Sequence, residues 1–279
     1  MKDIYNYFLL IRPLNVLVSG LAMIISAAIL DSLDQELMVI LVVLVVMAYT
    51  AGANSINDVL DLEIDKVNRP SRPIPSKNIR KKKALIFSFF LFLLGSVLSL
   101  QLPSNAYFIS IVVSMPLMII YSTHLKSKPL IGNIAVSFII GLSFIFCGTA
   151  FGNVYPMLTP GLLAFGLTLI REITKDIADL EGDQIAKHNT YPIQYGIKGA
   201  IKLISVLSCV VFLSALVPYF NNTYNDWYLI ILLIGVEIPL IIVVFLLVKN
   251  PTISSAILSS KILKFSTIMG LSAIYTGSL

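Results

Sequence analysis

The stretch LMVILVVLVVMAYTAGANSINDVLDLEID (residues 37–65) joins a long apolar run directly to a cluster of acidic side chains. Its apolar part is long enough to cross about 30 Å of hydrocarbon as a helix. At 100° per residue, Asp61, Asp65 and Asn54 all lie within about 60° of Asp58. The end of the predicted helix therefore presents three carboxylates and an amide on one narrow face.

Crowded carboxylates repel one another unless cations neutralise them, and oxygen ligands of this kind suit a divalent metal ion. A solvated acidic helix end is the alternative for a single pattern. The pattern recurs in REITKDIADLEGD (residues 171–183), where Asp176, Asp179 and Asp183 repeat the i, i+3, i+7 spacing after a second apolar run. Two such helix ends predict two halves of one site.

The composition indicates a membrane protein. Hydrophobic residues make up 57% of the chain and charged residues 13%, and the mean hydropathy of +0.89 lies outside the range of soluble domains. No cleavable signal peptide is predicted. We expect an all-α, polytopic membrane protein with one domain, residues 1–279. Its nine predicted membrane spans are residues 14–30, 37–60, 84–102, 106–123, 130–150, 159–177, 200–220, 227–248 and 262–277.

The positive charges predict the orientation, because Lys and Arg in short loops are retained on the cytoplasmic side. With nine spans, all 20 Lys and Arg residues fall on one face. The N-terminus and both acidic motifs are then cytoplasmic, and the C-terminus lies outside the cell membrane. Lys249, Lys261 and Lys264 are expected between the eighth and ninth spans. The net charge of +5 suits membrane lipids with anionic headgroups, and no nucleic-acid partner is indicated.

A basic, proline-rich segment follows the first motif. Three prolines within residues 66–76 exclude an ordinary helix, and we expect the resulting path to hold Arg69 and Arg72 near the carboxylates. Arginine beside a metal-binding acidic face suits a phosphate bridged between metal and guanidinium. A loop that only sets topology would explain the basic residues 80–83 better than these two arginines.

The sequence NDVLDLEID (residues 57–65), followed by NRPSRP (68–73), resembles the first signature of the UbiA superfamily of intramembrane prenyltransferases. DIADLEGD (176–183) resembles the second. The resemblance covers essentially the whole chain. It implies nine transmembrane helices around a central cavity, with a cytoplasmic cap made by the two motif-bearing loops. It also implies transfer from a polyprenyl diphosphate donor to a lipid or small-molecule acceptor with the help of Mg²⁺.

The resemblance further implies roles for individual residues. Asp58 would lie beside the metal ligands as a further catalytic carboxylate. Tyr121 would stabilise the allylic cation or shape the pocket, although interfacial anchoring is commoner for a lone membrane tyrosine. The implied metal ligands and catalytic carboxylates are Asn57, Asp61, Asp65, Asp176, Asp179 and Asp183. The implied contacts of the donor diphosphate are Arg69, Arg72 and Lys126.

Shorter motifs point to the acceptor. Residues 12–15, 68–73 and 171–176 look most like the archaeal branch that makes digeranylgeranylglyceryl phosphate. That branch transfers a geranylgeranyl group to the free hydroxyl of geranylgeranylglyceryl phosphate. An anionic acceptor would need its own cations away from the metals. The candidate acceptor-binding residues are Arg12, Asn15, Arg171 and Lys175. No residue stands out as a general base.

Other functions stay open at this point. Within the same reaction class, the acceptor could be an aromatic quinone precursor such as 4-hydroxybenzoate, or haem. A cation-coupled transporter would place its carboxylates near the membrane midplane, whereas both motifs here lie at one face. Glu237, inside the eighth span, is functional, lies near an end of its helix, or is paired with a helix neighbour. Asn133 either binds substrate or hydrogen-bonds between helices, and we favour the second role. No obligate protein partner is inferred.

Overall fold

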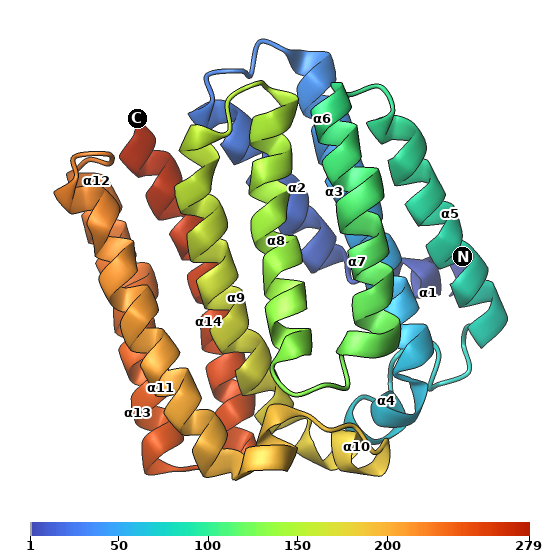
Figure 1. Cartoon of the computed structure of the whole chain (residues 1–279). Coiled ribbons are helices and arrows are strands. Elements are labelled where there is room, and N and C mark those ends of the chain that lie inside the picture. Colours follow the sequence, from blue (N-terminus) through green and yellow to red (C-terminus); the bar gives the residue numbers. More distant parts are fainter. Residues whose placement is uncertain (1) are drawn as a thin grey trace.

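The structure is a computed structural model that describes residues 2–279. Over this range the chain forms helices and no strand, which confirms the predicted all-α class, and most helices run side by side in one bundle (Figure 1). The elements are α1 Lys2–Leu10, α2 Pro13–Ile29, α3 Glu36–Leu60, α4 Leu62–Asn68, α5 Lys81–Ser99, α6 Ser104–Tyr107, η1 Phe108–Ser114, α7 Met115–Ile120, η2 Tyr121–Leu125, α8 Ile131–Ala150, η3 Tyr155–Met157, α9 Leu158–Ala178, α10 Leu180–Ile185, α11 Tyr191–Phe220, α12 Asp226–Leu232, η4 Leu233–Glu237, α13 Ile238–Lys249 and α14 Ile253–Ser278.

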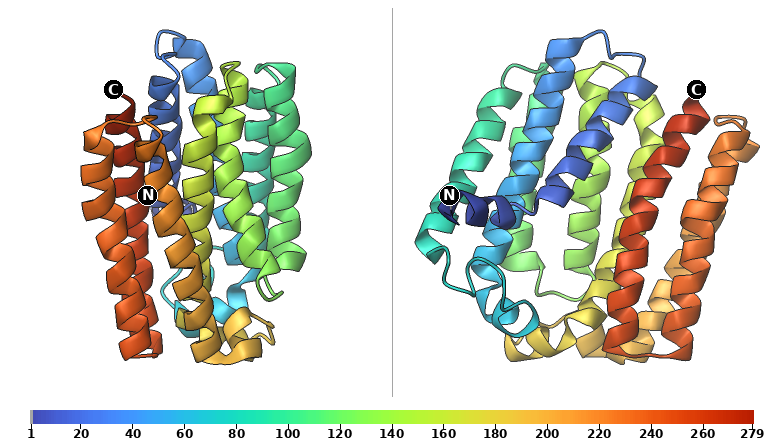
Figure 2. Two further views of the ribbon diagram at one scale, coloured as in Figure 1. Left: turned by 60° about the vertical axis from the view of Figure 1, so that its left-hand side comes forward. Right: turned by 180° about the vertical axis from the view of Figure 1, so that it is seen from behind.

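Eight helices in the described part of the chain are long and apolar enough to cross a membrane. The first predicted span corresponds to α2, whose 17 residues cover only about 26 Å. The α1–α2 pair is bent by 60° and gives a ninth span if the two helices count as one. Pro13 starts α2, which is the position that proline favours. In Figure 2, α1 lies across the direction of the long helices and does not continue along the axis of α2.

The long helices close a ring. α2 packs against α3, α3 against α7 and η2, and η2 and α7 against α8. The ring continues through α9 and α14, and α14 returns to α2. α5 packs on α3, while α11, α12 and α13 pack on α9 and α14. The short helices α4 and α10, which carry the ends of the two acidic motifs, lie in contact at the same end of the bundle (Figure 1).

Two spans contain π-helical turns just before a proline. The turn η1 ends two residues before Pro116, and η4 ends two residues before Pro239. Proline lacks an N–H and clashes with the carbonyl four residues earlier, and a locally wider turn relieves both problems in a membrane helix. The sequence predicted both spans but not these turns.

The helices α8 and α9 approach closely at two facing glycines. A Cβ on Gly141 would lie 2.8 Å from the carbonyl oxygen of Gly161, and a Cβ on Gly161 would lie 3.1 Å from that of Gly141. Small residues let helix backbones approach each other inside a membrane. This contact therefore positions α9, which carries the second acidic motif, against α8.

Substitution of Gly141 by Ala is expected to lower the melting temperature in detergent. The added methyl group meets the backbone of α9, which cannot rotate away, and overpacking of this kind costs roughly 1–3 kcal/mol. Gly270→Ala is the matched control, because its Cβ would meet only the side chains of Val236 and Leu167 at 3.5 and 3.7 Å. The higher helix propensity of Ala should keep or raise the melting temperature there. Equal melting temperatures for the two variants would contradict the close approach.

Candidate active site

Each acidic motif contains a break in its helix. Asp61 separates α3 from α4 at φ −83° and ψ 11°, and Asp179 separates α9 from α10 at φ −98° and ψ 8°. The helix that was predicted to carry each motif is therefore not continuous, although Asp58 and Asp65 still face one side and share Arg72. Carboxylates four residues apart repel one another and are unfavourable at a helix C-terminus. The break moves the last carboxylate of each motif, Asp65 or Asp183, onto a short second helix.

Gly182 allows these short helices to pack together. A Cβ at Gly182 on α10 would lie 2.4 Å from Nδ2 of Asn68 and 2.9 Å from Cγ2 of Ile64, both on α4. Asn68 Nδ2 in turn donates a long hydrogen bond of 3.4 Å to the backbone carbonyl of Asp179. The two motifs thus meet in space, as the sequence predicted.

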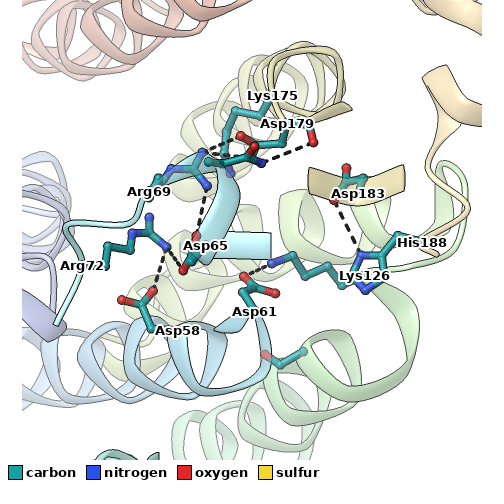
Figure 3. A network of polar contacts seen from close by, with 12 residues as sticks. Asp58, Asp61, Asp65, Arg69, Arg72, Lys126, Lys175, Asp179, Asp183 and His188 are labelled. Atoms are coloured by element: carbon teal, nitrogen blue, oxygen red, sulfur yellow. Dashed lines mark hydrogen bonds and ion pairs between the residues drawn. The ribbon is translucent and has the colours of Figure 1, made fainter. Parts of the chain in front are cut away.

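Arg69 links the two motifs directly (Figure 3). Its Nη2 donates to both carboxylate oxygens of Asp179 at 2.7 and 2.9 Å, and its Nη1 lies 3.4 Å from Oδ1 of Asp65. Burial lowers the pKa of Arg69, but the charges of Asp179 and Asp65 outweigh it, so that the pKa lies above its ordinary value. The guanidinium is therefore charged and holds one carboxylate from each motif.

Arg72 holds two carboxylates of the first motif. Its Nη1 lies 2.6 Å from Oδ2 of Asp65 and 3.0 Å from Oδ1 of Asp58. Asp58 also accepts a hydrogen bond from Arg12, so two guanidinium groups hold this carboxylate. Burial, followed by the charge of Arg12, lowers the pKa of Arg72. Arg12 itself adopts a left-handed conformation at φ 54°, which a non-glycine residue keeps only where its surroundings fix it.

Two further contacts bring neighbouring helices to the motifs. Lys126, which directly follows η2, forms an ion pair with Asp61. Asn133 of α8 donates a hydrogen bond of 2.8 Å from Nδ2 to Oδ2 of Asp176 on α9. This bond confirms the interhelical role expected for Asn133. Both contacts connect a motif carboxylate to the ring of long helices.

Glu172 forms a separate ion-pair group one turn before the second motif. Oε1 of Glu172 accepts from Nη1 of Arg171 at 3.0 Å, and Oε2 accepts from Nζ of Lys175 at 2.7 Å. Two of the three cations expected to bind an anionic acceptor, Arg171 and Lys175, are therefore held by one carboxylate. This group carries one more positive charge than negative charge.

Among the residues that the structure describes, Asp183 has no charged partner as close as those of the first motif. His188 Nδ1 lies 3.7 Å from its Oδ1 (Figure 3), but burial and the charge of Lys126 lower the pKa of His188, so the imidazole is neutral at pH 7. Burial, together with the charges of Asp179 and Asp61, raises the pKa of Asp183 to about 7. Its ionised form is thus under-compensated in the free protein.

The oxygen donors of the two motifs fit a hard divalent cation. Among the described residues no three His, Cys, Asp or Glu side chains surround a common metal position, because Arg and Lys side chains occupy the space beside the carboxylates. Oδ1 of Asn57 is nevertheless buried without a hydrogen-bond partner, and burial raises the pKa of Asp65 and Asp183. Mg²⁺ prefers carboxylate and amide oxygens and would satisfy these groups where the basic side chains move aside.

A cavity of about 1050 Å³ extends from the motif end into the bundle. Apolar side chains such as Val45, Phe144 and Leu271 line its membrane part. Of the predicted site residues, those that line it are Arg12, Asn15, Asn57, Arg69, Arg72, Tyr121, Arg171, Lys175 and Asp179. Those that do not are Asp58, Asp61, Asp65, Lys126, Asp176 and Asp183. Asp58 and Asp65 therefore lie behind the arginines that pair with them, and Asp179 is the motif carboxylate that lines the cavity.

Two lysines that the sequence did not assign to the site line the cavity. Lys261 was expected in the loop before the ninth span, but both Lys261 and Lys264 lie within α14. Nζ of Lys264 donates a hydrogen bond of 3.0 Å to Oδ1 of Asn15 on α2. Their i, i+3 spacing, which places both on one helical face, was the available signal.

Glu237 lies apart from this site. It ends the π-helical turn η4, is 1% exposed, and neither of its carboxylate oxygens has a hydrogen-bond partner among the described residues. Of the alternatives left open for Glu237, pairing with a helix neighbour is therefore excluded within the described residues. It does not line the cavity.

The fold and site together define a multi-pass membrane protein in which two acidic helix ends meet at the mouth of an internal cavity. The sequence pattern of the UbiA prenyltransferase family matches residues 15–266. The chain therefore belongs to the UbiA prenyltransferase family, and it is a polyprenyl transferase. The predicted membership of the UbiA superfamily is thereby confirmed.

Individual relatives and solved structures give a more specific comparison than the family as a whole. The chain is 36% identical over 277 residues to digeranylgeranylglyceryl phosphate synthase of Methanosphaera stadtmanae, covering 98% of this chain and 99% of the relative. The enzyme of the same name from Methanobrevibacter smithii is 36% identical over 281 residues, covering 98% and 97%. A solved structure described as digeranylgeranylglyceryl phosphate synthase is 34% identical, with a TM-score of 0.78 over 100% of this chain and 99% of that one. A UbiA homologue from Archaeoglobus fulgidus, solved with GPP and Mg²⁺, shares the fold at 16% identity, with a TM-score of 0.70 over 96% and 99%.

Asp183→Asn is expected to stabilise the metal-free protein in a pH-dependent way. The pKa of Asp183 is raised to about 7, above about 3.9 in an unfolded chain. The folded state therefore binds this proton more tightly, and the group lowers stability as pH rises from about 4 to 7. With chelator present, the melting temperature of the variant should exceed that of the wild type by a few degrees at pH 8 and by less at pH 5.

The exposed neighbour Glu181 supplies the control for this comparison. Glu181→Gln should leave the pH dependence of the melting temperature as it is in the wild type. A difference between Asp183→Asn and the wild type that is the same at pH 5 and pH 8 would show that Asp183 is not under-compensated.

Proposed function

We propose that this chain transfers a geranylgeranyl group from geranylgeranyl diphosphate to the free hydroxyl of geranylgeranylglyceryl phosphate, forming the second ether bond of an archaeal lipid. The observation that carries the proposal is a single cavity that joins a cation-rich end to an apolar part within the bundle. An amphiphilic donor and an amphiphilic acceptor both fit such a cavity. The near full-length identity to digeranylgeranylglyceryl phosphate synthases supports this acceptor.

The donor diphosphate would bind at the motif end. Arg69 and Arg72 line the cavity there and are buried enough to make strong charge-assisted hydrogen bonds. Lys126 reaches the same end through its ion pair with Asp61. The Mg²⁺ ligands in this proposal are Asn57, Asp61, Asp65, Asp176, Asp179 and Asp183. When bound, Mg²⁺ would neutralise the negative charge that develops on the diphosphate oxygens.

The residues around the reacting atoms explain the rest of the chemistry. The allylic C–O bond of the donor breaks, its electron pair leaves with the diphosphate, and the hydroxyl oxygen of the acceptor forms the new C–O bond. Tyr121 lines the cavity with 9% of its surface exposed, so its ring can face the allylic cation. The apolar wall excludes water as a competing nucleophile. The hydroxyl proton passes to a motif carboxylate or to the released diphosphate.

The acceptor phosphate would bind away from the metal ligands. Arg171 and Lys175 of α9 and Asn15 of α2 line the same cavity, whereas the third candidate cation, Arg12, pairs with Asp58 at the motif end. These residues come from α9 and from the start of α2 rather than from the short helices α4 and α10. Phosphate at this position would direct the acceptor hydroxyl toward the donor without displacing the diphosphate.

We further propose that the protein lies in the cell membrane with the motif end in the cytoplasm and the C-terminus outside. The distribution of Lys and Arg supports this orientation. The C-terminus lies at the opposite end of the bundle from α4 and α10 (Figure 1). The closed ring of long helices supports one domain over the whole chain, residues 1–279.

A single assay tests the proposed reaction. Purified protein in detergent is incubated with Mg²⁺, geranylgeranyl diphosphate and either geranylgeranylglyceryl phosphate or 4-hydroxybenzoate, and products are identified by mass spectrometry. We expect an ether product from the phosphorylated lipid, and its loss when a chelator removes Mg²⁺. Product from 4-hydroxybenzoate alone would move the protein to aromatic prenylation. An ether product that forms equally well with chelator would overturn the role of Mg²⁺.

Asp61→Ala and Asp183→Ala are expected to lower kcat by about two orders of magnitude or more, because each removes an oxygen ligand from the metal site. Glu63→Ala is the matched control, since Glu63 lies on the same acidic segment but points to solvent with 68% of its side chain exposed. Its kcat should match that of the wild type. Activity retained in both aspartate variants would reject the metal assignment.

A further inference from the structure

The cavity has a surplus of positive charge on one side. At the motif end Arg12, Arg69 and Arg72 are each paired with a carboxylate. On the side formed by α9 and α14, the cationic side chains that line the cavity are Arg171, Lys175, Lys261 and Lys264. Glu172 is the acidic residue among them that lines the cavity, and it pairs with the first two.

Neither lysine of α14 is neutralised by a carboxylate. Within residues 4–279, whose side chains the structure describes, Lys261 and Lys264 form no ion pair, and the side-chain hydrogen bond of Lys264 goes to the neutral amide of Asn15. Lys264 also lies close enough to Arg171 and Arg12 to be repelled by their charges. Cations that converge on a cavity without a matching anion favour the binding of one.

The same face of α14 continues into the apolar part of the cavity. The side chains of this helix that line the cavity include, in order, Ile257, Lys261, Lys264, Ile268, Leu271 and Ile274. Their spacing of three or four residues places them on one helical stripe. One helix thus offers two ammonium groups followed by an apolar surface. This order matches an amphiphile with an anionic head and a hydrocarbon tail.

We propose that Lys261 and Lys264 bind the phosphate of the acceptor and make the enzyme selective for a phosphorylated over an unphosphorylated acceptor lipid. The inference rests on the proposed function and extends it to residues of α14. Asn15 is a positioning residue, because its amide oxygen holds the Lys264 ammonium at the cavity wall. The phosphate offsets most of the surplus positive charge of the α9–α14 side, and the lipid chain lies along Ile268 and Leu271.

The test compares two acceptors that differ only in the phosphate. Initial rates are measured in lipid-free detergent with geranylgeranyl diphosphate and either geranylgeranylglyceryl phosphate or geranylgeranylglycerol. The Lys261→Gln, Lys264→Gln double variant should raise KM for the phosphorylated acceptor by about tenfold or more, since it loses two charge-assisted contacts. KM for the donor, and the rate with geranylgeranylglycerol, should stay within about twofold of the wild type.

Two single variants probe the mechanism. Lys264→Arg keeps the charge and should restore most of the affinity for the phosphorylated acceptor. Asn15→Asp would give Lys264 a carboxylate partner and should raise KM for that acceptor although no lysine is removed. Lys202→Gln is the control, because this exposed lysine of α11 does not line the cavity, and its kinetics should equal those of the wild type.

The outcomes distinguish a failure of the proposed function from a failure of the lysine assignment. A wild-type enzyme that does not prenylate geranylgeranylglyceryl phosphate overturns the proposed function, and the lysine assignment with it. A wild-type enzyme that does so, with a double variant whose KM for this acceptor is unchanged, overturns only the lysine assignment. A donor KM that rises as much as the acceptor KM would also overturn it, because the lysines would then serve the diphosphate. A monodisperse double variant with a wild-type melting temperature shows that the loss is not one of folding.

Discussion

Buried carboxylates at the ends of two membrane helices impose the constraint on which the site depends. A carboxylate buried without a partner is costly in a low-dielectric interior, so each must meet a cation or lose its charge. Asp65 is fully buried, and its partners Arg69 and Arg72 come from the proline-rich segment that follows it. Arg69 also reaches Asp179 of the second motif. The arginine that neutralises Asp65 thus also binds the second motif, and this contact holds two helix ends that are distant in sequence side by side.

The same ion pairs couple the binding of donor and metal. In the free protein, the groups proposed to bind diphosphate are held by those proposed to bind metal: Arg69 by Asp179, and Lys126 by Asp61. If a diphosphate binds these basic side chains, the buried carboxylates lose their partners. Another cation must then bind the carboxylates, because an unpaired buried charge is costly. We therefore expect diphosphate and Mg²⁺ to bind together, each weakly when the other is missing.

Hydropathy predicted the long helices, because lipid solvation acts on each apolar segment separately. The number of spans and the distribution of Lys and Arg predicted that both motifs lie at one end. The spacing also predicted the proximity of Arg69 to the carboxylates. The break at Asp61 could not be predicted, because its stability depends on partners from distant segments such as Lys126. Lys261 was expected in a loop for another reason. Serines in the first turns of α14 lower the hydropathy of that part of the helix. Hydropathy measures transfer to lipid, so it does not detect the part of a helix that extends beyond its most apolar residues.

Charge balance separates the two anionic substrates within one cavity. At the motif end, the three arginines are already matched by carboxylates, so a diphosphate arriving there requires added positive charge. On the α9–α14 side, the cations outnumber Glu172, and a phosphate can bind with no added ion. Two anions in a low-dielectric cavity repel each other unless each is neutralised locally. In the proposed arrangement, local neutralisation of the two anions lets the allylic carbon and the acceptor hydroxyl approach each other. Only the binding of the donor diphosphate then requires a metal ion.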